Sequence, residues 1–101
     1  MTGNTVTIGL QIVPKSKAYD SYQLVDKAID IIRLSGIKHQ ITPFETVMEG
    51  DYQEIMTICQ KAEQAVLDAG ADECLVYYRI HYRKSGDVTF EEKNMDRYLK
   101  K

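Results

Sequence analysis

The segment from Thr42 to Gly50, TPFETVMEG, gathers side chains that suit a flat, cationic and partly apolar ligand. It holds an aromatic ring at Phe44, a hydroxyl at Thr46 and carboxylates at Glu45 and Glu49. A ring can stack on a planar ligand, a hydroxyl can hydrogen-bond ring nitrogens, and a carboxylate can offset a positive charge. The same residues are equally consistent with a strand that carries a solvated acidic edge.

Other chemistries lack the residue spacings that they need. The candidate metal ligands His39, Cys59, Cys74 and His81 show neither a CxxC nor an HxxxH spacing, so no zinc site is predicted. The sequence has no GxSxG nucleophile motif, and its six glycines are isolated rather than grouped in a phosphate-binding loop. We therefore predict no metal and no cofactor, and these patterns point to no catalytic residue.

The composition restricts the class of protein. With 101 residues, 44% of them hydrophobic and 28% charged, the chain is expected to form one domain over residues 1–101. Thirteen Lys and Arg against 15 Asp and Glu leave a net charge of -2, which argues against a nucleic-acid surface. Two cysteines cannot build a disulfide framework, and neither a membrane span nor a leader is visible. We expect a cytoplasmic protein with no nucleic-acid or membrane partner.

Hydrophobic periodicity predicts the element order βαββαβ. Alternation predicts strands at residues 5–13, 37–42, 44–49 and 74–82. Apolar residues at helical spacing predict helices at residues 21–35 and 51–69, followed by a short helix from residue 89. Pro14 should end the first strand because it has no N–H for a ladder. Pairs at capping-box spacing, Asp51 with Glu54 and Thr89 with Glu92, mark two helix starts.

This order predicts an α+β fold, the ferredoxin-like plait. Right-handed crossovers place both long helices on one face of a four-stranded antiparallel sheet. The other face mixes apolar and polar side chains, namely Thr7, Gly9, Gln11, Leu75, Tyr77, Arg79 and His81. Leu75 and Tyr77, together with Val13, give this open face more apolar surface than a monomer usually exposes. We therefore expect self-association through the open face, as a dimer or a tetramer.

Over nearly its whole length the chain resembles the small thiamine-binding proteins with a ferredoxin-like fold. The likeness rests on five segments: LQIVP at residues 10–14, LVDKAIDII at 24–32, SGIKHQITPFETVMEGD at 35–51, DAGADECLVYYRIHYR at 68–83 and VTFEEK at 88–93. The most specific piece is PxxTxxEG, which here is Pro43, Thr46, Glu49 and Gly50.

The resemblance implies a non-catalytic protein that binds thiamine (vitamin B1) or its hydroxymethylpyrimidine half and assembles through its open sheet faces. Gln11, Thr46 and Glu49 match the family pattern. Tyr77 and His81 stand where many relatives have Asn and Asp, and loss of the carboxylate at position 81 weakens a site for a cation.

The resemblance also suggests a role for each residue. Thr46 and Gln11 would hydrogen-bond the aminopyrimidine, Phe44 or Tyr77 would stack on a ring, and Glu49 or Glu45 would face the thiazolium. The predicted ligand-binding residues are Gln11, Phe44, Thr46, Glu49, Tyr77 and His81.

Two other functions stay open at the level of sequence. One is a small oligomeric isomerase or cofactor-free oxygenase on the same fold, with a pocket around His81 and that imidazole as general base. The other is an oligomeric structural or regulatory protein with a vestigial site. A paired acid or base would favour the enzyme, and the sequence does not show one.

Overall fold

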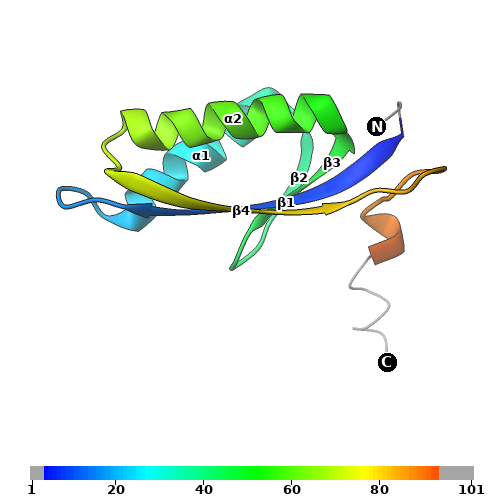
Figure 1. Cartoon of the computed structure of the whole chain (residues 1–101), viewed down its shortest axis with the longest axis horizontal. Helices are drawn as coiled ribbons and strands as arrows, with labels where there is room; N and C mark the ends of the chain where they lie inside the picture. The colour runs from blue at the N-terminus through cyan, green and yellow to red at the C-terminus, as the bar shows by residue number, and fades with distance from the viewer. Residues whose placement is uncertain (1–3, 94–101) are drawn as a thin grey trace.

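The computed structural model describes residues 4–93 and confirms the predicted order of elements. Its strands are β1 (Thr5–Lys15), β2 (Lys38–Ile41), β3 (Thr46–Asp51) and β4 (Glu73–His81). Its helices are α1 (Ser21–Ser35), α2 (Tyr52–Asp68) and a short 3-10 helix (Glu91–Lys93). The two long helices cover one face of the sheet, and the 3-10 helix lies on the other side (Figure 1). This is the predicted ferredoxin-like α+β arrangement.

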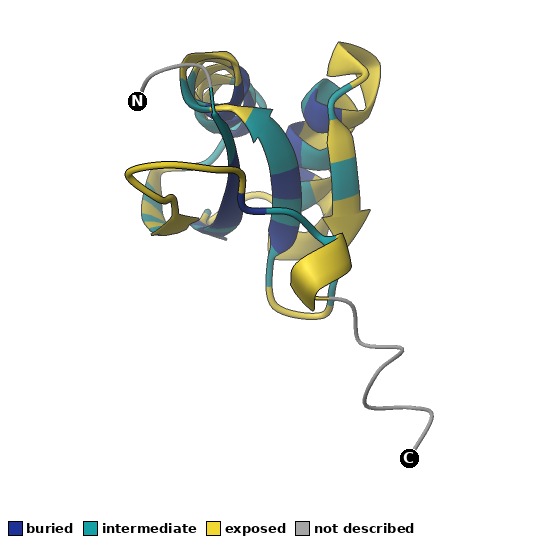
Figure 2. Ribbon diagram, turned by 90° about the vertical axis from the view of Figure 1, so that its right-hand side faces the viewer, coloured by how far each residue is buried: buried dark blue, intermediate teal, exposed yellow. Residues whose placement is uncertain are grey.

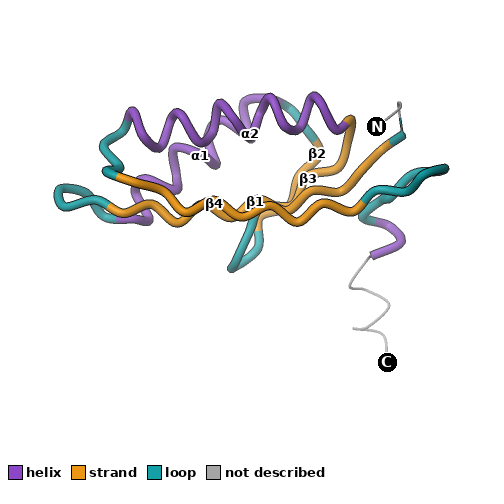
Figure 3. The backbone as a smooth tube through the Cα atoms, viewed as in Figure 1, coloured by secondary structure: helices purple, strands orange, loops and turns teal. Residues whose placement is uncertain are grey.

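The sheet is antiparallel, with the strand order β2-β3-β1-β4. β1 pairs with β3 only as far as Leu10, which lies opposite Thr46. It pairs with β4 much further, as far as Lys15 opposite Glu73. The two strands run on together past the end of β3 in Figure 3. The second half of β1 is therefore an edge on the side where β3 has ended.

Both long helices begin and end where their sequence signals predict. The Asp20 carboxylate accepts two backbone N–H groups of the first turn of α1, and Gly36 ends that helix with a φ of 77°. The Asp51 carboxylate accepts the Glu54 N–H at 3.0 Å and so caps α2. The apolar stripes of the helices pack on every second strand residue, on the face of the sheet that is turned toward the helices. Figure 2 shows the buried residues between the two layers. The core includes Val6, Ile8, Leu10, Leu24, Ala28, Ile32, Met48, Ile55, Cys59, Ala62 and Val66.

Pro14 does not end the first strand, contrary to the prediction. β1 continues to Lys15, and Pro14 lies opposite Cys74. At that position β1 has a single strand neighbour, because β3 stops pairing at Leu10. A proline is tolerated on such an edge because one side of the strand has no ladder to interrupt.

The third strand is shifted by two residues from the prediction, because the first two residues of the predicted strand belong to a turn. The Thr42 hydroxyl donates to the Glu45 carbonyl at 2.7 Å and accepts the Glu45 N–H at 3.1 Å. These bonds close a tight loop around Pro43, so β3 begins only at Thr46. In Figure 1 this β2–β3 loop bends to the side of the sheet opposite the helices. The last strand, β4, is shifted by one residue from the prediction.

Residues 87–93, which we call the strap, cover one end of the open face. Val88 is fully buried, its N–H donates to the Thr5 carbonyl at 2.9 Å, and its carbonyl accepts the Thr7 hydroxyl at 3.0 Å. Thr89 and Glu92 make the predicted reciprocal cap. The helix expected from residue 89 is a 3-10 helix as far as Lys93, and its remaining part lies outside the described residues. The face predicted to be open is therefore open only beyond the strap.

Candidate functional site: a groove beside the end of β3

A groove of about 100 Å³ lies where β3 stops pairing with β1. One wall is β1, a second is the β2–β3 loop, and a third is α1. A smaller apolar crevice of about 30 Å³ between β1 and α1 shares much of this lining. The groove is lined by Leu10, Gln11, Ile12, Val25, Ile29, Ile41, Thr42, Pro43, Phe44, Glu45 and Thr46.

Thr46 contributes a hydroxyl-bearing side chain to the lining of this groove. The residue is 7% exposed and lies opposite Leu10, on the face of the sheet that packs on the helices. Within residues 4–93 the structure gives its hydroxyl no hydrogen bond, although the residue lines both the groove and the crevice. No fully buried side-chain oxygen or nitrogen of the described residues lacks a hydrogen-bond partner, so the Thr46 hydroxyl keeps some contact with solvent in the groove. The hydroxyl is therefore available to a ligand.

Three of the six predicted ligand residues meet in the groove. Gln11 reaches it from β1, Phe44 from the β2–β3 loop and Thr46 from the first position of β3. The Phe44 side chain is 80% exposed, so its ring is free to cover a ligand. Tyr77 lies opposite Gln11 on β4, where it is 53% exposed on the open face. Tyr77 is thus a neighbour of the groove through Gln11 and is not part of its lining.

Glu45 is the carboxylate of the groove, and Gly9 makes room for it. A Cβ atom on Gly9 would overlap the Glu45 carboxylate, which therefore lies directly over the bare backbone of β1. The two ion pairs found within residues 4–93 are Lys38–Glu49 and Arg83–Glu92, so Glu45 belongs to neither. A negative charge thus lies at the open-face end of the groove, next to Gln11 along β1.

Glu49 and His81 lie away from the groove and contact other parts of the chain. Glu49 is opposite Thr7, and its carboxylate binds the Lys38 ammonium at 2.9 Å and accepts the Phe90 N–H at 2.8 Å. The Nδ1 atom of His81 is 2.5 Å from the Lys93 Nζ. Both residues therefore anchor the strap.

Val25 and Ile29 form an apolar wall that was not among the predicted site residues. Both belong to the apolar stripe of α1, but they are only partly buried, whereas Leu24, Ala28 and Ile32 of the same helix are buried. The apolar stripe of α1 is thus wider than the surface that the core covers. This width was the one feature of the sequence that could have indicated the apolar wall of the groove.

The other titratable side chains of the core do not reach the groove. Burial raises the pKa of the Cys59 thiol to about 12, so the thiol stays neutral and unreactive, as expected for a small buried hydrophobic residue. Burial and the hydrogen bond to Glu63 raise the pKa of Tyr78 above its usual range. In the described part of the chain, no group of three or more His, Cys, Asp or Glu side chains could hold a metal ion.

Comparisons with known proteins agree on one family. The family model described as "Thiamine-binding protein" matches residues 8–97. A UPF0045 protein of Clostridium perfringens is 34% identical over 90 residues, which cover 89% of this chain and 94% of that protein.

Two solved structures are similar in both sequence and fold. A DUF77 domain of unknown function from Bacillus cereus superposes with a TM-score of 0.89 at 37% identity, covering 93% of this chain and 90% of that one. A Thermotoga maritima protein, provisionally named as a thiamine biosynthesis or salvage protein, has a TM-score of 0.81 at 27% identity, covering 92% and 98%. No described helix is both long and apolar enough to cross a membrane.

Proposed function

The chain belongs to the thiamine-binding protein family, and on this premise we propose that it binds thiamine or its hydroxymethylpyrimidine moiety in the groove beside β3. The observation that carries the proposal is the Thr46 hydroxyl, which belongs to a residue only 7% exposed, makes no hydrogen bond within residues 4–93 and lies in the groove lining. A flat aminopyrimidine offers ring nitrogens and an amino group to such a hydroxyl.

The remaining groups of the groove match the two halves of thiamine. The apolar walls from Val25 and Ile29 fit the faces of the pyrimidine, and the Gln11 amide can pair with its amino group. Phe44 is exposed and can close over a ring. Glu45, rather than Glu49, faces the thiazolium, because the Glu49 carboxylate is held by Lys38 and the strap.

We infer that a second copy of the chain completes the site. The groove encloses about 100 Å³, whereas ligand sites usually enclose about 300 Å³ or more. On the open face beyond the strap, Leu75 is 46% exposed and Tyr77 is 53% exposed, and Gln11 lies opposite Tyr77. A subunit docked there would cover these side chains and add walls beside Gln11 and Glu45. Light scattering should then give at least twice the chain mass, and Tyr77→Glu should lower it to one chain.

The protein is proposed to act as a binder rather than as an enzyme. Catalysis around His81 would need a cavity and a paired acid or base. His81 is exposed, contacts Lys93 and lines neither the groove nor the crevice. A purely structural protein would bind neither thiamine nor hydroxymethylpyrimidine.

Calorimetry with three ligands tests the proposal. Thiamine and hydroxymethylpyrimidine should each bind saturably at micromolar affinity, with one ligand per chain. Oxythiamine, in which an oxygen replaces the pyrimidine amino group, should bind at least about tenfold more weakly, since the hydrogen-bonding groups would be mismatched. No heat from any of the three at high protein concentration would reject the proposal.

A further inference from the structure

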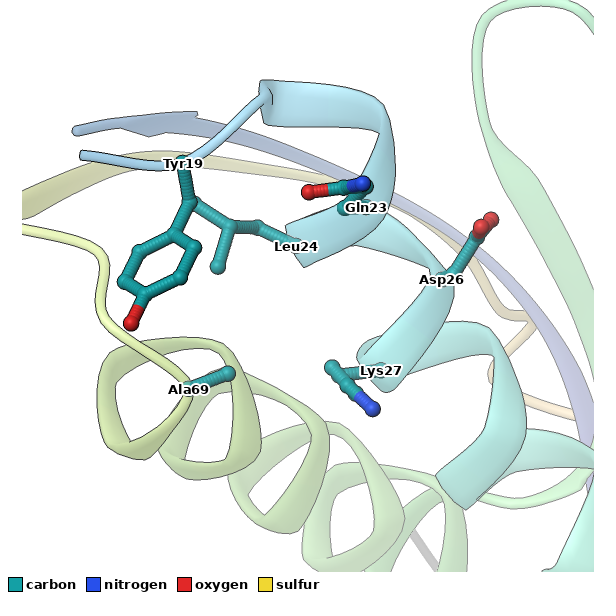
Figure 4. Close-up of a pocket in the computed structure, with 6 residues that line it drawn as sticks. All are labelled: Tyr19, Gln23, Leu24, Asp26, Lys27 and Ala69. Atoms are coloured by element: carbon teal, nitrogen blue, oxygen red, sulfur yellow. The ribbon is translucent and has the colours of Figure 1, made fainter. Parts of the chain in front are cut away.

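A second and larger recess lies between the first turns of α1 and the C-terminal end of α2. It measures about 400 Å³ and shares no lining residue with the groove. Cavities that bind small molecules usually measure about 300 to 1,000 Å³, so this α1–α2 recess is large enough for a ligand. It lies in the helix layer, on the side of the sheet opposite the open face (Figure 4).

The loops at the rim of the recess are bound to each other. The Ser16 hydroxyl donates to the Gly70 carbonyl at 3.0 Å and accepts the Tyr19 N–H at 3.1 Å. The Asp72 carboxylate accepts the Lys17 N–H at 2.9 Å. These bonds join the β1–α1 loop to the α2–β4 loop, so the recess is formed before any ligand arrives.

Tyr19 forms a flat aromatic wall, and Gly70 fixes its position. A Cβ atom on Gly70 would lie 2.5 Å from a carbon of the Tyr19 ring. The φ of Gly70 is 122°, a conformation that other residues rarely adopt. The ring therefore lies against bare backbone, and 54% of the residue's surface stays exposed.

The rest of the lining combines an apolar floor with a polar rim that holds one cation, Lys27, and one anion, Asp26. Leu24 is 2% exposed and Ala69 is partly buried, and they form the floor. Gln23 and Lys27 are one helical turn apart on α1, and Lys27 extends toward α2 (Figure 4). The Asp26 carboxylate points away from the space between the helices. Lys27 belongs to neither ion pair found within residues 4–93.

We propose that the α1–α2 recess is a second binding site, selective for a small aromatic carboxylate. The ring of the ligand lies against Tyr19 and over Leu24 and Ala69, and its carboxylate lies between the Lys27 ammonium and the Gln23 amide. The flat wall selects a planar body. The Lys27 ammonium, which is in neither ion pair of residues 4–93, selects an anion and disfavours a cation such as thiamine. The site does not depend on the function proposed for the groove.

Titrations followed by amide NMR shifts test this site with three simple probes. Benzoate carries the ring and the charge, benzamide is its neutral isostere, and benzylamine is a cation of similar size. Benzoate should shift the amides of residues 19–27 and 69–70 saturably at millimolar concentration. Benzamide should bind about fivefold more weakly, the factor that one exposed ion pair contributes, and benzylamine should not bind.

Two exposed positions supply the variants, so folding is not at risk. Lys27→Gln should remove the preference for benzoate over benzamide, and Tyr19→Leu should weaken both probes. Lys61→Gln, on an exposed part of α2 outside the recess, should change neither. Absence of saturable shifts at these residues, or a benzoate preference that survives Lys27→Gln, would overturn the proposal.

Discussion

Two buried threonines on neighbouring strands show how differently the two ends of this sheet are used. Thr7 and Thr46 are 6% and 7% exposed, and they are the buried polar residues of the described chain. Thr7 points to the open face, where its hydroxyl donates to the Val88 carbonyl of the strap. Thr46 points to the helix side, where its hydroxyl has no hydrogen bond within residues 4–93.

The carboxylates of the same region repeat this difference. Glu49 binds Lys38 and the Phe90 N–H, whereas Glu45 lies over Gly9 in neither of the two ion pairs. At the strap end the chain satisfies its own polar groups, which contributes to stability. At the groove end polar groups stay available, which a folding protein tolerates where a ligand or water pairs with them.

The largest expected effect comes from Thr46→Val, which keeps the side-chain shape and removes the hydroxyl. Affinity for hydroxymethylpyrimidine should fall about 10- to 100-fold, because a buried hydrogen bond to the ligand is lost. Stability should not fall, since the hydroxyl has no hydrogen bond within residues 4–93. Calorimetry and urea unfolding measure the two quantities. An unchanged affinity would remove Thr46 from the site.

Thr7→Val is the matched change at the strap end, and it should have the opposite pattern. The Val88 carbonyl would lose its donor, which costs about 1 kcal/mol in the free energy of unfolding. Ligand affinity should stay the same, because Thr7 does not line the groove. If affinity fell with stability, the two ends of the sheet would not be separate in function.

Glu45→Gln distinguishes the binding of the thiazolium half of thiamine from the binding of its pyrimidine half. Thiamine should bind about fivefold more weakly, because the variant no longer faces the thiazolium with a negative charge. Neutral hydroxymethylpyrimidine should bind as before. Gly9→Ala should have the same effect by displacing the Glu45 carboxylate, and Glu49→Gln serves as the control. If thiamine affinity fell with Glu49→Gln and not with Glu45→Gln, Glu49 would be the carboxylate that faces the thiazolium.

The smallest expected effect is an acid sensitivity of the strap. The Arg83 guanidinium, helped by the Thr89 N–H, holds the pKa of Glu92 at about 2, below its ordinary value of 4.5. A lowered pKa stabilises the strap above pH 4.5, and this contribution is lost as the pH falls toward 2. The protection of the Val88 amide, which is its exchange rate compared with that of an unfolded peptide at the same pH, should therefore fall over that range in the native protein. Glu92→Gln should abolish this pH dependence, and Glu91→Gln should keep it.

Most of the fold followed from local patterns in the sequence. Alternation, the capping residues Asp20 and Asp51, and Gly36 were enough to predict the elements that build the plait. The errors occurred where tertiary pairing decides. Pro14 remains in a strand because β3 ends early, and Phe44 and Glu45 leave β3 because Thr42 closes a turn.

The candidate site could be predicted only in part. Residue types pointed to Phe44 and Thr46, the family resemblance added Gln11, and these three do meet in the groove. Glu49 shares the motif with Thr46 but faces the other side of the sheet, where the strap binds it. That contact joins residues 41 positions apart, so no local pattern could indicate it.

Chemical-shift mapping with hydroxymethylpyrimidine tests the central claim most directly. The claim is that the groove end of the sheet is open to ligand and the strap end is not. The largest amide shifts should fall on Gln11 and residues 41–46, with little change at residues 5–7 and 87–90. Shifts concentrated on the strap and Glu49, with the groove residues unmoved, would contradict it.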